Sequence, residues 1–180
     1  MIDLTKRTLP NTINVGGVLF SINTDYRIWL RFENSLKNLH KGDSLDLRYL
    51  FKNDYPVIND ISGLLEFSRP KNILPRPIKS SDVIPLDYEI DSDLIYSAFL
   101  GQYGIDLVDI EELHWHKFLA LLNGLNDSQK LSEVMGYRCY EKQNEKEDIY
   151  EKLKYAWEIE PPLTNEQQAE LDEFNKLFGG

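Results

Sequence analysis

The feature that most constrains the fold is a helical spacing of apolar side chains, repeated in short segments that glycine or proline separates. Within each segment the apolar residues recur every three or four positions, and Gly104, Gly124 and Pro161-Pro162 close three of the segments. A helix with its apolar side chains along one face buries that face against a neighbouring element. The pattern therefore predicts a bundle of several helices.

A β-hairpin is predicted ahead of the first helix, over residues 12–22. Apolar and polar residues alternate on both sides of Gly16-Gly17, a pair that readily supplies the positive φ angles of a two-residue turn. Because an isolated hairpin is only marginally stable in water, we expect this one to lie against helices. The predicted fold class is mainly α, a multi-helix bundle with a small N-terminal β-hairpin packed on it.

The positions of the helices follow from their apolar residues and capping signals. Asn23 or Thr24 is the expected cap of the first helix, which runs to about Leu39. Further helices are predicted over residues 43–53, 60–67, 91–103, from Asp106 or Asp109 to before Gly124, after residues 126–128, over 149–157, and after Pro161-Pro162. The helix that ends before Gly124 is apolar around more than half of its circumference, so we expect it at the centre of the core.

Two glycines have predicted roles in and after the helix over residues 91–103. Gly104 is expected to stop this helix in the left-handed conformation that glycine adopts without strain. Gly101 lies on the same side of the helix as Ser97, away from the apolar stripe. This pair of small residues predicts a place where a neighbouring backbone could approach closely.

Prolines divide the chain without separating two full domains. Between residues 69 and 85 stand Pro70, Pro75, Pro77 and Pro85, a density that cannot continue a helix and predicts a mobile or extended connector. We therefore expect the hairpin and first helices in residues 1–68, the proline-rich connector in 69–85, the helical core in 86–160 and a C-terminal helix in 161–180. All four are predicted to form one compact domain with an extension, because 180 residues are too few for two full domains.

The charge balance limits the partners that the protein can bind. A formal net charge of −10, with basic residues scattered along the chain, repels phosphate groups, so we expect neither nucleic acid nor a membrane as a partner. No secretory leader and no apolar run long enough to span a bilayer is present in the sequence, so we expect the protein in the cytoplasm.

Few residues could carry catalysis or hold a metal ion. On a helix, His114 and His116 would point about 200° apart and could not share an ion, so we interpret His114 as buried and His116 as exposed. Glu111 and Glu112 diverge in the same way, and Cys139, the only cysteine, is interpreted as a residue packed near a helix end. We therefore predict no catalytic residue, no cofactor and no metal. A hydrolase or metal protein built on the two histidines is the less favoured alternative.

The C-terminal segment carries the candidate binding surface. Thr164 and Gln167 form a capping box at the start of a predicted helix. The apolar stripe of this helix, the predicted site of self-association or client binding, comprises Leu171, Phe174, Leu177 and Phe178. Such a helix can fold back on its own domain or lie in a groove of a neighbouring copy. Docking on the same chain is favoured, because termini that dock commonly do so in cis.

Three runs of sequence between residues 88 and 138 resemble a family of tailed-phage proteins known as "gene product fifteen". They begin at Ile95, Leu113 and Val134 and read IYSAFLGQYGIDL, LHWHKFLAL and VMGYR. The hairpin and first helix, which read VGGVLFSINTDYRIWLRF from Val15, resemble the opening of the same family. Together the similar segments extend over most of residues 12–140.

This resemblance implies a role in the assembly of a phage tail. Proteins of the family are similar in size and gene position to tail assembly chaperones, which coat the aggregation-prone tape measure protein and leave before the tail is complete. Such chaperones often have a short form and a frameshifted long form. We therefore expect a protein that binds and solubilises the tape measure protein in the host cytoplasm and is not an enzyme. The alternative is a structural tail component, a completion or initiation protein retained in the virion.

Overall fold

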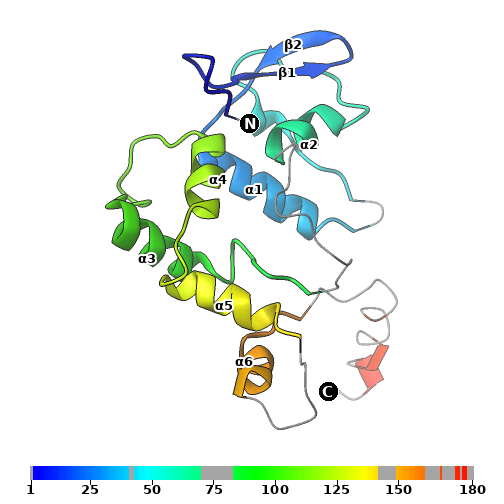
Figure 1. The fold of residues 1–180 in the computed structure, drawn as a ribbon. Helices are drawn as coiled ribbons and strands as arrows, with labels where there is room; N and C mark the ends of the chain where they lie inside the picture. Colours follow the sequence, from blue (N-terminus) through cyan, green and yellow to red (C-terminus); the bar gives the residue numbers. More distant parts are fainter. Residues whose placement is uncertain are drawn as a thin grey trace.

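The structure, a computed structural model, describes residues 2–40, 43–69, 83–141 and 149–160, together with residues 167, 173–174 and 176–177. Its elements are β1 (Thr12–Val15), β2 (Val18–Ser21), α1 (Tyr26–Lys37), the 3-10 turn η1 (Arg48–Leu50), α2 (Ser62–Ser68), α3 (Ser92–Tyr103), α4 (Trp115–Asn123), α5 (Lys130–Arg138) and α6 (Ile149–Trp157) (Figure 1). The predicted fold class, mainly α with an N-terminal hairpin, is confirmed. Most of the predicted proline-rich connector and of the predicted C-terminal helix lies outside the described residues.

The hairpin forms where the sequence predicts it. Strands β1 and β2 pair antiparallel, with Val15 opposite Val18, and the turn between them has φ angles of 60° at Gly16 and 88° at Gly17. Helix α2 packs on β1 at Gly63, where an added Cβ would lie 2.5 Å from the backbone oxygen of Asn14. The hairpin is therefore held against a helix, as its marginal stability in isolation requires.

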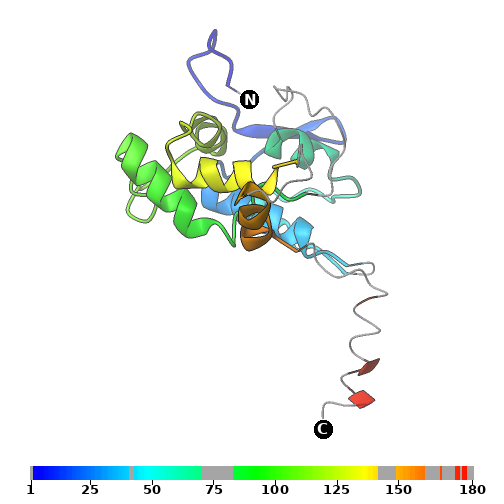
Figure 2. The ribbon, with the colours of Figure 1, turned by 60° about the horizontal axis from the view of Figure 1, so that its bottom comes forward.

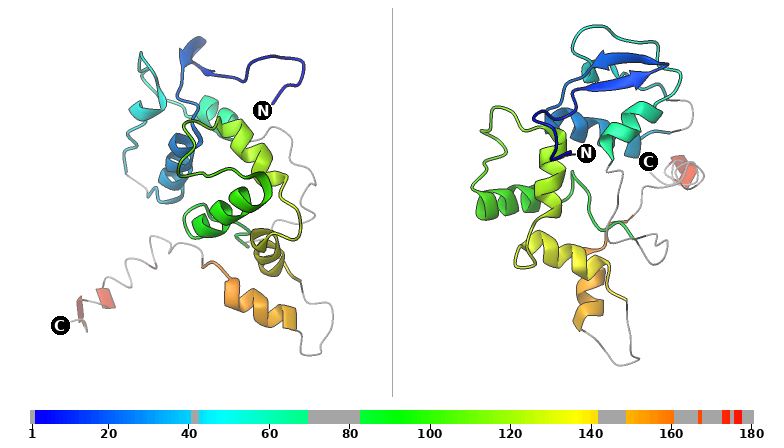
Figure 3. Two further views of the ribbon diagram at one scale, coloured as in Figure 1. Left: turned by 90° about the vertical axis from the view of Figure 1, so that its left-hand side faces the viewer. Right: turned by 45° about the horizontal axis from the view of Figure 1, so that its top comes forward.

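The helices pack one against the next from one end of the molecule to the other. Helices α1 and α4 pack on each other between the hairpin with α2 on one side and α3 on the other (Figure 2). Helix α5 packs on α3, and α6 packs on α5. As a result, α6 lies at the end of the molecule opposite the hairpin (Figure 3, right).

A stack of aromatic rings centred on Phe118 forms the middle of the core. The ring centroid of Phe118 lies 4.9 Å from that of Tyr26, 5.1 Å from that of Phe99 and 5.6 Å from that of Trp115, and all three pairs are stacked. Aromatic rings bury large areas and stabilise one another by about 0.5–1.5 kcal/mol per pair beyond that burial. Phe118 thus connects α1, α3 and α4. The part of α4 around Phe118 therefore lies at the centre of the core, as expected for this helix.

The predicted cap of the first helix is wrong by one or two residues. Asp25 caps α1, because its carboxylate accepts the backbone N–H of Arg27 at 3.0 Å. The side chain of Asn23 instead donates to the backbone oxygen of Tyr49, and Thr24 lies in an extended segment whose backbone oxygen accepts from the N–H of Trp115. Long-range pairing of this segment therefore moves the helix start to Tyr26.

The helix predicted over residues 43–53 is wrong. Only the short turn η1 forms there, because the backbone of this segment pairs with the end of β2 and the residues just after it. The N–H of Asn23 donates to the oxygen of Leu50, and the N–H of Lys52 donates to the oxygen of Ser21. The apolar residues of the pattern are nevertheless buried, so they fill the core from an irregular backbone.

The helix predicted from Asp106 or Asp109 begins only at Trp115, and residues 104–114 form a loop. Asp106 starts this loop with a tight turn in which its carboxylate accepts the N–H groups of Val108 and Asp109. The oxygen of Leu107 accepts from Tyr26 of α1. A helix does not form here, because these backbone N–H and C=O groups hydrogen-bond to side chains and not to one another along a helix.

Candidate interaction surface

The residues that the structure describes form no cluster of metal-ligating side chains. Among them, no group of three or more histidine, cysteine, aspartate or glutamate side chains is placed to hold a metal ion. Glu111 and Glu112 lie in the loop before α4, where Glu112 accepts a hydrogen bond from the hydroxyl of Thr24. Within the described ranges no helix has both the length and the hydropathy needed to cross a bilayer.

His116 is buried and not exposed as expected, and His114 is only half-buried, because His114 precedes the helix instead of lying inside it. His114 is half-buried and caps α4, with its Nδ1 accepting the backbone N–H of His116 at 3.0 Å. Its Nε2 lies 2.9 Å from the oxygen of Pro10. His116 is buried, and its Nε2 lies 2.8 Å from the oxygen of Phe67. Each Nε2 carries the proton, because a carbonyl oxygen can only accept.

Burial keeps these imidazoles neutral. Burial lowers the pKa of His114, and it lowers the pKa of His116 to about 4 despite the hydrogen bond to Phe67. Neutral rings with their ring nitrogens bonded to backbone groups tie the N-terminal segment and the end of α2 to α4. We interpret the pair as structural.

Cys139 is exposed at the C-terminal end of α5, so the expectation that it is packed is wrong. Its backbone N–H caps the helix by donating to the oxygen of Met135. The position near a helix end is as predicted, but the side chain points away from the core.

The surface best suited to binding is an apolar groove between α1, α3, the N-terminal half of α4 and the loop 104–114, which we call the tyrosine groove. Its volume is about 370 Å³. It is lined by Tyr26, Leu30, Tyr88, Ser92, Asp93, Ile95, Tyr96, Leu107, Val108 and Phe118. Val108 stands at its rim with 76% of its surface exposed.

The polar groups of the tyrosine groove are largely used within the protein. The hydroxyl of Tyr26 donates to the oxygen of Leu107 at 2.6 Å, and that of Tyr96 donates to Asp106 at 3.1 Å. Burial raises the pKa of Tyr26 and raises the pKa of Tyr88 to about 12, so both phenols stay protonated. Apart from Ser92 and Asp93, the groove therefore presents ring faces and aliphatic groups, which suit apolar side chains better than a charged ligand.

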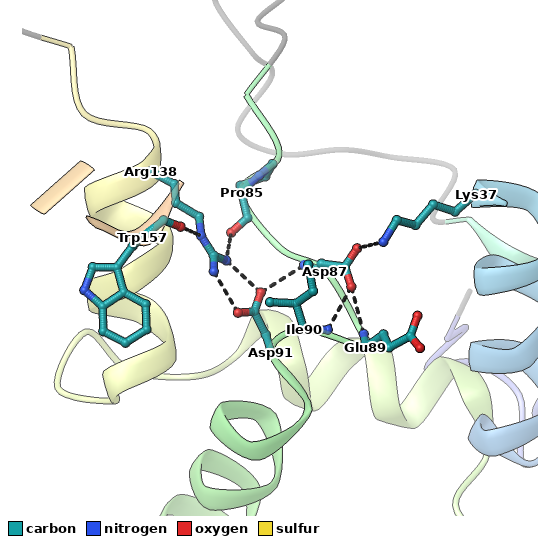
Figure 4. A network of polar contacts seen from close by, with 8 residues as sticks. All are labelled: Lys37, Pro85, Asp87, Glu89, Ile90, Asp91, Arg138 and Trp157. Carbon is teal, nitrogen blue, oxygen red and sulfur yellow. Dashed lines mark hydrogen bonds and ion pairs between the residues drawn. The ribbon is translucent and has the colours of Figure 1, made fainter. Parts of the chain in front are cut away.

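A buried polar network fixes the α3 side of the groove (Figure 4). Arg138 of α5 donates to Asp91, at the start of α3, through Nη1 at 2.7 Å and Nη2 at 2.8 Å. It also donates to the backbone oxygens of Trp157 and Pro85. One guanidinium thus joins α3, α5, the end of α6 and the segment that carries Tyr88.

Asp87 extends this network to α1. Its carboxylate accepts from Lys37 and from the backbone N–H groups of Glu89 and Ile90. Burial alone would raise the pKa of Asp87, but these hydrogen bonds together lower it. The aspartate is therefore ionised at neutral pH and anchors the turn that places Tyr88 in the groove.

The predicted binding stripe of the C-terminal segment is described only in part. Phe174 and Leu177 have helical backbone and are 57% and 70% exposed. Leu171 and Phe178 lie outside the described residues. The role of the stripe in self-association or client binding stays a prediction.

A comparison with protein families gives one match. A family model described as "Bacteriophage Gp15 protein" matches residues 5–159, from ahead of the hairpin to just after α6. No curated protein and no solved structure matches the chain significantly.

Proposed function

The chain belongs to the Bacteriophage Gp15 protein family, and on this premise we propose that it is a phage tail assembly chaperone that binds the tape measure protein. Membership makes it a phage structural or assembly protein. The proposal adds the client and the mode of action: the protein shields apolar stripes of the tape measure helix in the host cytoplasm and acts by binding, without catalysis.

The observation that carries the proposal is the tyrosine groove. Amphipathic helices are commonly recognised by apolar grooves that accept their anchor side chains. A volume of about 370 Å³ lies at the small end of binding pockets and suits a few such side chains. Because Tyr26 and Tyr96 already use their hydroxyls within the protein, an aliphatic or aromatic anchor leaves both hydroxyls paired.

The charge of the chain supports the same role. Many copies bound along one long helical client would form a large assembly, held by repeated weak contacts. A net charge of −10 on each copy keeps such an assembly in solution through mutual repulsion.

Co-expression with the tape measure protein of the same phage tests the proposal. We expect the client to move from the insoluble to the soluble fraction and to co-purify with the tagged chain. A client that stays insoluble and never co-purifies would rule the chaperone function out.

The alternative within the same family is a structural tail component, such as a completion or initiation protein. The exposed apolar rim of the groove would then be a permanent interface. Mass spectrometry of purified virions separates the two functions, because a stoichiometric amount in the virion supports the structural component and absence supports the chaperone.

A further inference from the structure

We propose that the tyrosine groove selects a client stripe flanked by lysine or arginine. The partner is an amphipathic helix whose apolar side chains enter the groove while its basic side chains meet the carboxylates of Asp93, Asp106 and Asp109. The inference rests on the proposed function at one point, the use of this groove by the client, and adds the chemistry by which the client is recognised.

Carboxylates stand on two of the elements that line the groove. Asp93 belongs to the first turn of α3 and is itself a lining residue, three positions before Tyr96 on the same face of the helix. Asp106 and Asp109 flank Val108 in the loop 104–114. Both Asp93 and Asp109 are exposed. The apolar groove therefore has an acidic rim.

The two loop carboxylates lie close to the ring of Tyr96. The hydroxyl of Tyr96 donates to Asp106, and this hydrogen bond, partial loss of water and the negative charges of Asp106 and Asp109 raise the pKa of Tyr96. Hydrogen bonds from the backbone N–H groups of Val108 and Asp109 outweigh the effect of burial and lower the pKa of Asp106, so this carboxylate is ionised at neutral pH. An occupant of the groove therefore meets negative charge on the loop side.

Arg27 is a basic residue beside the groove, but its charge is already engaged. Its guanidinium lies 4.9 Å from the ring centroid of Tyr26 and forms an ion pair with Asp25. It also donates to the backbone oxygens of Leu107 and Ile110. This cation is compensated within the protein and does not neutralise the rim.

The exposed carboxylates of the rim lack such compensation. In the described part of the chain, neither Asp93 nor Asp109 forms an ion pair with another residue. An occupant that covers the groove also removes water from Asp93, which is unfavourable unless an opposite charge or a hydrogen-bond donor faces the carboxylate. The rim thus requires positive charge next to the apolar side chains of the occupant.

Lysine and arginine meet both requirements of the groove. Their charged ends pair with carboxylates, and their long aliphatic stems add contact with the ring faces. A stripe flanked by glutamate or aspartate would be repelled. A second copy of the chain is disfavoured for the same reason, because each copy carries a net charge of −10.

Titration of the full-length protein with fluorescently labelled helical peptides of about 18 residues tests the proposal. The first peptide has a stripe of leucines flanked by lysines, and the second has the same stripe flanked by glutamates. The third has the composition of the first, with its leucines dispersed around the helix. By fluorescence anisotropy we expect the first to bind at least about tenfold more tightly than each of the others. This preference should shrink as the salt concentration rises.

Two double variants with the same net charge locate the effect. Asp93→Asn with Asp109→Asn should weaken binding of the lysine-flanked peptide about fivefold, because two exposed ion pairs are lost. Asp54→Asn with Asp127→Asn is the matched control, since both residues are exposed and neither lines the groove. The control should leave binding unchanged. Circular dichroism should show the same helix content in both variants and in the unaltered chain.

Four results would overturn the proposal. Equal affinities for the lysine-flanked and glutamate-flanked peptides would show that the rim does not select charge. Equal affinity for the dispersed peptide would indicate a general attraction of cations to an acidic protein. Equal weakening by the two double variants would show that net charge matters and the rim does not. No measurable binding of any of the peptides would show that the groove does not accept such a helix.

The inference and the proposed function can fail separately. If the tape measure protein never co-purifies while the lysine-flanked peptide binds as expected, the chaperone function is ruled out and the chemistry of the groove stands. If the tape measure protein co-purifies equally well with the unaltered chain and with the variant Asp93→Asn with Asp109→Asn, the rim does not recognise the client and the chaperone function stands.

Discussion

The carboxylate of Asp91 and the guanidinium of Arg138 face each other through two hydrogen bonds, with their side chains 2% and 3% exposed. A buried ion pair stabilises a fold only when further hydrogen bonds offset the loss of water. Arg138 meets this condition because it also donates to Trp157 and Pro85, and Asp91 also accepts the N–H of Asp87. The pair therefore sets how α5 and α6 sit on α3.

Arg138→Ala should lower the free energy of unfolding by about 3–5 kcal/mol, because it leaves the Asp91 carboxylate buried and unpaired. The double variant Arg138→Met with Asp91→Leu should lose less, since no buried charge remains. Urea unfolding followed by circular dichroism measures both. Arg48→Ala, which removes the exposed pair with Asp46, is the control and should leave stability unchanged. Equal losses for Arg138→Ala and the double variant would contradict the prediction.

Gly63→Ala should lower the free energy of unfolding by about 1–3 kcal/mol, the usual cost of inserting a methyl group into a closely packed contact. The new Cβ would lie 2.5 Å from the backbone oxygen of Asn14, so α2 would have to move away from β1. Gly136→Ala in α5 is the matched control, because its Cβ would meet no atom within 4 Å. That variant should gain about 0.5–1 kcal/mol from helix propensity, and a loss of the same size in both variants would argue against the contact.

The close backbone contact at Gly63 shows where a sequence pattern fails. The pair Ser97 and Gly101 predicts such an approach, but a Cβ at Gly101 would meet only the side chain of Gln129 at 3.9 Å. The two positions look alike in sequence, because whether a glycine is approached depends on which element packs there. Helix spacing within one segment cannot reveal that β1 lies over α2.

The elements that were predicted correctly are those fixed by neighbours in sequence. The hairpin follows from Gly16-Gly17, and the end of α3 follows from Gly104, whose φ is 65°. The errors over residues 43–53 and 104–114 arise where the backbone is satisfied by segments far away along the chain. Leu50 in the first segment and Leu107 in the second are both buried. The apolar spacing therefore identified them as core residues but did not predict the conformation of their backbone.

The tyrosine groove could not be predicted for the same reason. Tyr26, Tyr88 and Tyr96 lie in separate segments of the sequence, and the spacing within one segment cannot relate them to each other. Their common surface exists only because the network of Asp87, Asp91 and Arg138 places the segment before α3 against α1. The sequence held one signal of this network, its ionisable residues near helix ends. In the sequence alone, however, such residues look like charges exposed to solvent.

His116→Gln should remove part of the acid sensitivity of the fold. Burial lowers the pKa of His116 from 6.5 to about 4 in the folded protein. Between these two pH values the unfolded chain therefore binds a proton at His116 and the folded chain does not. This contribution to stability is complete well above pH 6.5 and is lost as the pH falls toward 4, by about 2 kcal/mol between pH 7 and 5. Urea unfolding at pH 7 and pH 5 should show a smaller loss in the variant, which keeps a donor for Phe67. Identical losses in both proteins would show that His116 does not titrate as proposed.

Val108→Glu tests the groove as the client surface without disturbing the core. The side chain of Val108 is 76% exposed at the groove rim, so a glutamate there keeps the fold but places a charge where an apolar anchor must enter. We expect about tenfold less tape measure protein to co-purify, equivalent to about 1.4 kcal/mol of binding free energy. Leu19→Glu adds the same charge at a similarly exposed apolar residue of the hairpin, and should leave co-purification unchanged. If both substitutions reduce it equally, net charge governs client binding and the groove does not; if neither does, the client binds elsewhere on the protein.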